Sequence, residues 1–172
     1  MSNTTDTLAR LVHVGEIARV LLDGDEASRI ITGDAMYHLA NESEEFRHLT
    51  LDHYNVDGPT FVRMKKLLLR LERLADVPVN SSLWVPVGTT GRVTVALQNG
   101  NVNRFYEFGQ RSIEMPDAMV RCFKEAVVVE LPPEDGKALV TALSPVFDSM
   151  EEVAAVLELS AAISGSTGAE YA

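Results

Sequence analysis

Two histidines, three carboxylates and two aromatic rings lie within the segment EEFRHLTLDHYN, residues 44–55. Imidazole and carboxylate groups bind transition metals and exchange protons in catalysis. The segment contains neither glycine nor proline, so we expect a helix. On that helix Glu45, His48 and Asp52 share one face, whereas His53 lies on the neighbouring apolar stripe.

The geometry of such a helix limits the chemistry of this segment. His48 and His53 diverge by about 140° around a straight helix, which excludes chelation of one ion by both. A divalent metal or acid–base site made by Glu45, His48 and Asp52 remains as the alternative hypothesis. Dinuclear sites in helical bundles use the Glu-x-x-His spacing twice, and here it occurs once. We therefore interpret the segment as the solvated edge of a helix and predict no cofactor other than that possible metal.

A second hypothesis concerns aromatic side chains on the expected sheet. Helices that cover one face of a small sheet often leave a pocket lined by aromatic rings. Trp84, Phe105 and Tyr106 are placed to line such a pocket, with His53 and Tyr54 contributed by the preceding helical segment. The sequence therefore indicates a ligand pocket as the alternative to ordinary core packing of these rings.

The elements that position these residues begin with helices. Apolar residues recur at helical spacing over 5–24, with Thr5 or Asp6 as the expected cap. Residues 25–40 predict short helical turns interrupted at Gly33, and 42–54 predict another helix. Gly58-Pro59 precedes a long amphipathic helix over 60–74.

From residue 76 onward the apolar period approaches two, which is typical of strands. Residues 82–87 predict a first strand, which Pro86 places at an edge or a bulge. Asn99-Gly100 is a preferred hairpin turn within the alternating run 92–108. A helix is expected over 115–126, and the apolar run 126–131 predicts a central strand.

The end of the chain is rich in helix formers. Residues 132–143 open with prolines and acids, as helices often do, and predict a helix that Ser144-Pro145 stops. Residues 149–164 predict a last helix with a capping box at Ser149 and Glu152. Val153, Val156 and Leu157 would form an apolar seam on it, which favours a homodimer.

This order of elements predicts an α+β fold. The expected architecture is an N-terminal helical layer followed by an antiparallel β-meander with flanking helices and a C-terminal helix. We expect a helical region over 1–75 and an α+β sheet region over 76–172, together forming one compact domain.

Composition excludes several classes of function. The formal net charge of −10 argues against binding to nucleic acid or to anionic membranes. The single cysteine, Cys122, excludes an intrachain disulfide and a thiolate zinc cluster. No membrane-spanning run and no secretion signal are visible, so a cytoplasmic location is expected. P-loop, dinucleotide-binding and hydrolase motifs are absent from the sequence.

The leading functional prediction is a non-catalytic binding or regulatory module, of the kind used in bacterial-type signal transduction. It would recognise a small molecule or a protein partner. A metal-dependent or acid–base enzyme using Glu45, His48 and Asp52 is the first alternative. A purely structural, dimeric partner protein is the second.

Overall fold

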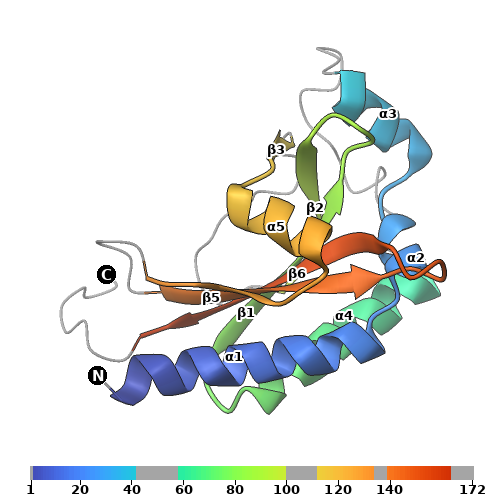
Figure 1. The fold of residues 1–172 in the computed structure, drawn as a ribbon. Helices are drawn as coiled ribbons and strands as arrows, with labels where there is room; N and C mark the ends of the chain where they lie inside the picture. The colour runs from blue at the N-terminus through green and yellow to red at the C-terminus, as the bar shows by residue number, and fades with distance from the viewer. Residues whose placement is uncertain (1, 42–57, 100–111, 134–138, 164–172) are drawn as a thin grey trace, which may run out of the picture.

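A six-stranded antiparallel sheet with helices on both faces forms the protein (Figure 1). The structure, a computed structural model, describes residues 2–41, 58–99, 112–133 and 139–163. α1 and α4 cover one face of the sheet, and α5 covers part of the other (Figure 1). The α+β class predicted from the sequence is confirmed.

The helices of the N-terminal half are α1 (Ser2–Leu21), α2 (Gly24–Ser28), α3 (Gly33–Asn41) and α4 (Pro59–Leu74). α1 begins at Ser2, before the caps that we expected. The Asp23 side chain caps α2, because it accepts hydrogen bonds from the amides of Asp25 and Glu26. Gly58 is the N-cap of α4, and the proline at the first position is preorganised for a helix.

The strands are β1 (Val79–Pro86), β2 (Arg92–Asn99), β3 (Ile113–Glu114), β4 (Val129–Leu131), β5 (Leu139–Phe147) and β6 (Val153–Ala162). α5 (Asp117–Glu125) lies between β3 and β4 in the chain, as the sequence predicted. The order across the sheet is β3-β2-β1-β6-β5-β4. The last strand in sequence therefore lies beside the first, at the centre of the sheet.

Two helices predicted for the end of the chain are wrong. The described part of 132–143 leads into β5, and β6 replaces the helix expected over 149–164. β6 pairs with β1 on one side and with β5 on the other. Ser149 and Glu152 belong to the β5–β6 turn, where the Glu152 amide donates to the Asp148 side chain. Tertiary pairing overrides the helix propensity of this alanine-, leucine- and glutamate-rich run.

The edge position offered for the strand with Pro86 and the central position predicted for the run 126–131 are also wrong. The pairing of β1 with β2 does contain a register shift, between Leu83 and Trp84. β1 is central because it pairs with both β2 and β6, and Pro86 is tolerated because it is the last residue of the strand. β4 is an edge strand that pairs only with β5 among the described strands. Its apolar side chains pack against α5 and do not reflect a central place in the sheet.

The apolar seam proposed for a terminal helix does not exist. Val156 and Leu157 are adjacent in β6, so they point to opposite faces of the sheet, and both are fully buried. They pack in two different cores and are not available to a second chain. The homodimer prediction thereby loses the feature on which it was based.

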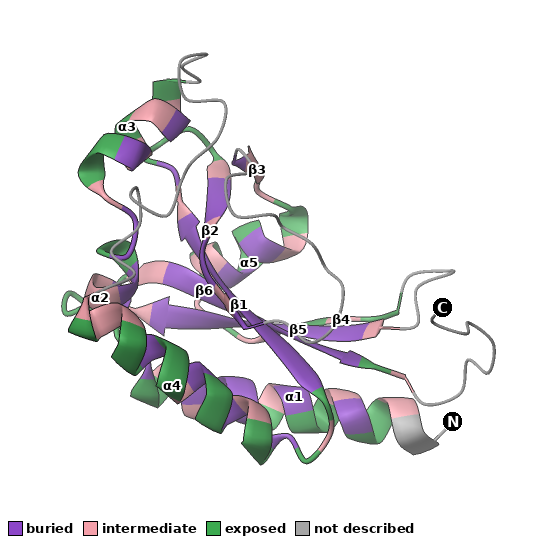
Figure 2. Cartoon of the chain, turned by 180° about the vertical axis from the view of Figure 1, so that it is seen from behind, coloured by how far each residue is buried: buried purple, intermediate pink, exposed green. Residues whose placement is uncertain are grey.

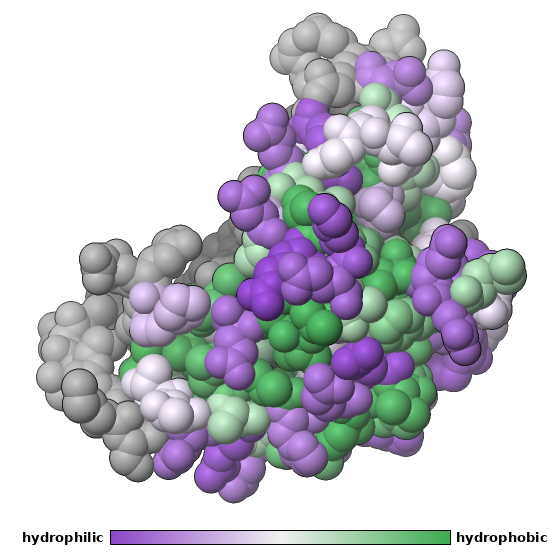
Figure 3. All heavy atoms as spheres, in the orientation of Figure 1, coloured by the Kyte–Doolittle hydropathy of each residue, from purple (hydrophilic) through white to green (hydrophobic). Residues whose placement is uncertain are grey.

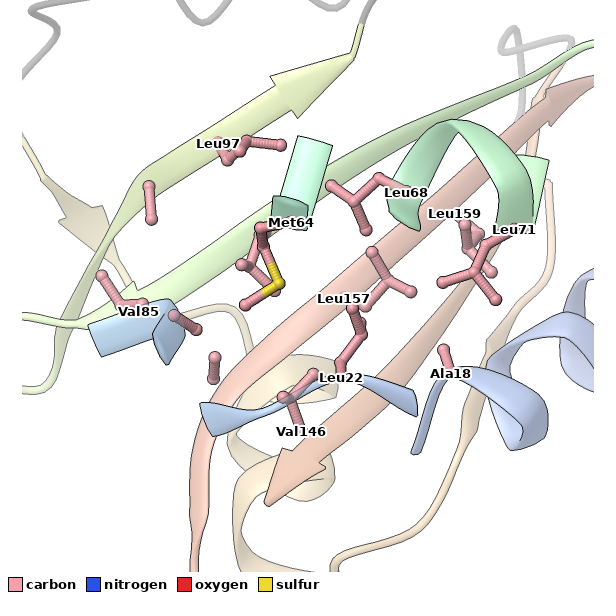
Figure 4. Close-up of a cluster of buried hydrophobic side chains, with 14 of the residues drawn as sticks. Ala18, Leu22, Met64, Leu68, Leu71, Val85, Leu97, Val146, Leu157 and Leu159 are labelled. Carbon is pink, nitrogen blue, oxygen red and sulfur yellow. The ribbon is translucent and has the colours of Figure 1, made fainter. Parts of the chain in front are cut away.

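The larger core fills the space between the sheet and the layer of α1 and α4. α1 contributes Leu11, Val14 and Ala18, whose spacing places them on one face of the helix. Figure 4 shows side chains of α4, among them Met64 and Leu71, directed toward Leu157 and Leu159 of β6. Burial of these side chains holds the helices to the sheet.

The smaller core lies under α5 on the opposite face. Met119 and Cys122 of α5 pack against Trp84, Leu143 and Val156 of the sheet. The outer side of α5 is hydrophilic and lies at the centre of the face seen in Figure 3. Among the described helices none is long and apolar enough to cross a bilayer.

Candidate functional site

Polar side chains gather on the α5 face of the sheet, beyond the part that α5 covers. Trp84 of β1 and Val156 of β6 belong to the apolar core under α5. Successive side chains of a strand alternate between faces, so residues two and four positions away share this face. These positions hold polar residues: Ser82 and Asn80 in β1, and Glu158 and Ser160 in β6. We call the whole group the polar sheet cluster; its members are Asn80, Ser82, Gln98, Thr141, Glu158 and Ser160.

Strand register brings the cluster together in two rows. Ser82 is paired with Gln98 of β2 on one side and with Glu158 of β6 on the other. In the second row, Ser160 of β6 lies between Asn80 of β1 and Thr141 of β5. Side chains directly opposite on neighbouring strands are close enough to interact. Residues from four strands therefore form one continuous polar surface.

The cluster is buried although it is polar. Glu158 is 8% exposed, and the other members except Gln98 are also buried. The hydroxyls of Thr141 and Ser160 are 2.9 Å apart, so one donates to the other. Asn80, Gln98 and Glu158 each have an interaction partner. A buried carboxylate is costly unless hydrogen bonds or opposite charge compensate for its lost hydration, so Glu158 depends on its polar neighbours.

Trp84 marks the border between the polar and apolar parts of this face. It is 2% exposed and lies two positions from Ser82 along β1. The other residues predicted to line a pocket, His53, Tyr54, Phe105 and Tyr106, lie outside the described residues. The aromatic pocket therefore stays a prediction, with Trp84 placed in a packed core beside the polar sheet cluster.

The predicted metal site also lies outside the described residues, because Glu45, His48 and Asp52 all belong to the range 42–57. Within the ranges that the structure describes, no group of three or more His, Cys, Asp or Glu side chains could hold a metal ion. The metal hypothesis stays a prediction.

Cys122 is a core residue. Its side chain is fully buried between α5 and the sheet. Burial raises the pKa of the thiol to about 12, because the thiolate would lose its hydration. The thiol is therefore protonated at neutral pH and is a poor nucleophile.

Sequence reasoning missed the polar sheet cluster because it placed two of its strands in helices. The signal is present in β6, where Val156, Glu158 and Ser160 alternate with the leucines and alanine that face α1 and α4. Read with a period of two, this run predicts a strand with a polar side. With a helical period, the same three residues would lie on different sides of a helix.

Comparison with known proteins leaves the family open. No protein-family model matches the sequence, and no curated protein matches it significantly. A solved structure described as the structure of the GAF domain aligns with 85% of this chain and 80% of its own, at a TM-score of 0.45 and 11% identity. Because that similarity is low, function must be argued from this chain's own residues.

Proposed function

We propose that this protein is a non-catalytic binding and regulatory module that recognises a small polar molecule at the polar sheet cluster. The observation that supports the proposal is the burial of a carboxylate, an amide and three hydroxyls on one face of adjoining strands. Ligand sites in proteins combine apolar walls with a few fixed polar groups that set orientation and specificity. Here Trp84 and Val156 supply the apolar border, and the cluster supplies the polar groups.

The types of these groups define the ligand class. The Glu158 carboxylate only accepts hydrogen bonds and favours a cationic or donor-rich group opposite it. The hydroxyls of Ser82, Ser160 and Thr141 donate or accept, and the amides of Asn80 and Gln98 do both. An amine- or amide-bearing molecule with further hydroxyl or carbonyl groups matches this set. An anionic molecule would be repelled by Glu158.

The composition of the cluster favours binding over catalysis. Nucleophilic catalysis by a hydroxyl needs a base within hydrogen-bond reach. Both histidines of the described residues lie on helices, His13 on α1 and His38 on α3. α1 packs on the opposite face of the sheet from the cluster. His13 therefore supplies no base to these hydroxyls, and we propose that the cluster serves recognition.

The sheet offers a direct route from binding to regulation. Glu158 lies between Leu157 and Leu159 in β6, and these leucines pack in the core under α1 and α4. A ligand that moved Glu158 would also move the leucines, because adjacent residues of a strand share one rigid backbone. Cores of native density transmit such shifts. Ligand binding on one face would thus change the helical layer on the other.

The test is a ligand screen with a matched pair of variants. Small amines, amides and nucleobases are screened by thermal shift, with small dicarboxylates as anionic controls. Trp84, the only tryptophan of the chain, should report binding by a change in its emission. We expect an amine- or amide-bearing compound to raise Tm in the wild type and in Glu130→Gln, an exposed site on β4, but not in Glu158→Gln.

Two results would overturn this proposal. One is that a stabilising compound raises Tm equally in Glu158→Gln and in the wild type, which would place its site elsewhere. The other is that only dicarboxylates stabilise the protein. Circular dichroism confirms first that both variants keep the native fold, so that a loss of response reflects the site.

A further inference from the structure

An open, shallow depression, called the hollow below, lies along the outer side of α4 and is lined by apolar and cationic side chains. The hollow has a volume of about 670 Å³. The described residues that line it are Pro59, Val62, Arg63, Lys66, Leu67 and Arg70. Residues three and four apart lie on one side of a helix, so this lining is a single stripe along three turns. Figure 2 shows that the stripe side of α4 is exposed, whereas the opposite side is buried against the sheet.

Charge is strongly segregated on this helix. α4 carries five of the 15 Lys and Arg residues of the chain and one of its 25 Asp and Glu residues. The helix is thus +4 in a protein of net charge −10, and the rest of the chain is −14. The one acid of the helix, Glu72, is half-buried and accepts a hydrogen bond from the Ser81 hydroxyl. All the charged side chains on the outer side of α4 are therefore basic.

The cations of the hollow differ in how they are neutralised. Arg63 forms an ion pair with Glu26 of α2. Among the ion pairs between described residues, none involves Lys66 or Arg70, and both side chains are exposed. Beside them Val62 is 43% exposed, although it is a large apolar side chain on a helix. Two available cations thus flank an uncovered apolar surface.

We propose that this hollow docks a short acidic segment of a partner protein, with an apolar side chain seated on Val62 and Leu67. Carboxylates of the segment would pair with Lys66 and Arg70, and complementary charge would orient the encounter. The rest of the chain, at −14, disfavours an extended polyanion or an anionic bilayer, because either would also meet that acidic surface. A short acidic segment can contact the basic side of α4 without also contacting the acidic surface.

The experiment uses a labelled peptide in which leucines at helical spacing are flanked by glutamates. Binding to the full chain is followed by fluorescence anisotropy at low and high salt. The double variant Lys66→Glu/Arg70→Glu is compared with Lys65→Glu/Arg73→Glu, which makes the same change of charge on the same helix outside the hollow. All four side chains are exposed, so both variants should fold.

We expect the wild type to bind the peptide and the first variant to bind it about tenfold more weakly or worse. The second variant should retain most of the affinity. Added salt should weaken peptide binding to the wild type and to the second variant. The proposal is overturned if the wild type does not bind, or if both variants lose affinity equally. Equal affinity for polyglutamate would show that Val62 and Leu67 have no role in binding. Tighter binding of a short oligonucleotide would identify nucleic acid as the partner instead. Each of those results also contradicts the proposal.

Discussion

The hydroxyl of Ser144 donates a hydrogen bond of 2.6 Å to the backbone carbonyl of Gly15, and so joins β5 to the middle of α1. Ser144 is fully buried. A Cβ atom on Gly15 would lie 3.2 Å from the Cβ of Ser144, so the glycine allows the helix to approach the strand closely. This contact connects residues from the two ends of the chain and orients α1 on the sheet.

Removing the Ser144 hydroxyl should weaken this junction moderately. The Gly15 carbonyl lies inside a helix and keeps its helical hydrogen bond, so Ser144→Ala should lower the free energy of unfolding by about 1 kcal/mol. Ser144→Val adds bulk where the helix is closest and should cost about 1–3 kcal/mol. Urea denaturation measures both. A valine variant as stable as the alanine variant would contradict the close approach.

Two glycines make a matched test of packing at the starts of neighbouring helices. A Cβ on Gly24 would lie 2.8 Å from both the backbone of Phe147 and the Cβ of Ala154, whereas a Cβ on Gly33 meets nothing within 4 Å. Gly24→Ala should therefore destabilise the protein by about 1–3 kcal/mol. Gly33→Ala should stay within about 1 kcal/mol of the wild type. Thermal unfolding of the two variants compares them, and similar losses would refute the packing of α2 on β5 and β6.

Glu72 should make stability depend on pH in the acid range. Burial raises the pKa of this carboxyl above its usual value, and the hydrogen bond from Ser81 only partly opposes that rise. The folded state therefore favours the protonated form. The contribution of Glu72 to stability is complete below its usual pKa and is lost as pH rises through the raised value.

Glu72→Gln removes this titration while it keeps the shape of the side chain. The stability of the wild type relative to the variant should fall between acidic and neutral pH and then stay level. Urea unfolding of both proteins across that range measures the difference. A difference that stays constant or rises with pH would contradict the burial of this carboxyl.

Trp84 should contribute strongly to the core under α5. The indole is 2% exposed and packs with residues of α5 and the sheet. Trp84→Ala should lower the free energy of unfolding by about 3–5 kcal/mol. Val120→Ala, on the outer side of α5, should change it by less than about 0.5 kcal/mol. Denaturation followed by circular dichroism tests this pair, and a mild effect at Trp84 would instead favour a role in an open pocket.

Cys122 should be unreactive in the native protein. Its thiol is buried, and burial raises its pKa to about 12. A thiol-specific disulfide reagent should therefore react slowly with the folded protein and rapidly after denaturation. The absorbance of the chromophore that the reagent releases, followed over time with and without urea, measures the two rates. Fast reaction in the native state would show that α5 detaches readily from the sheet.

Local pattern predicted the helices α1, α4 and α5 and the strands β1 and β2 well, because their periodicity and boundary residues agree with their tertiary environment. The amphipathic face of α4 places Met64, Leu68 and Leu71 in the core, as predicted. In the loop after β1, Gly88 and Gly91 adopt positive φ, which glycine tolerates without strain. At these elements local and global preferences coincide.

The polar sheet cluster could not be assembled from the sequence. It depends on β6 inserting between β1 and β5, which pairs the last strand with the first, as in the pair of Trp84 with Val156. No local signal reports a contact of that sequence separation. The high helix propensity of the alanines, leucines and glutamate in β6 even favoured the opposite assignment.

By itself, the sequence determined the α+β class, the helices of the first half and the acidic balance, because these follow from overall composition and from the local spacing of apolar residues. Only the tertiary structure decided which strands are central and which side chains meet. It placed Glu158 and Ser82 side by side on a buried face, and it separated Val156 from Leu157 into different cores. The physical reason is that strand pairing is a long-range choice, stabilised by burial on both faces of the sheet rather than by the preferences of any one segment.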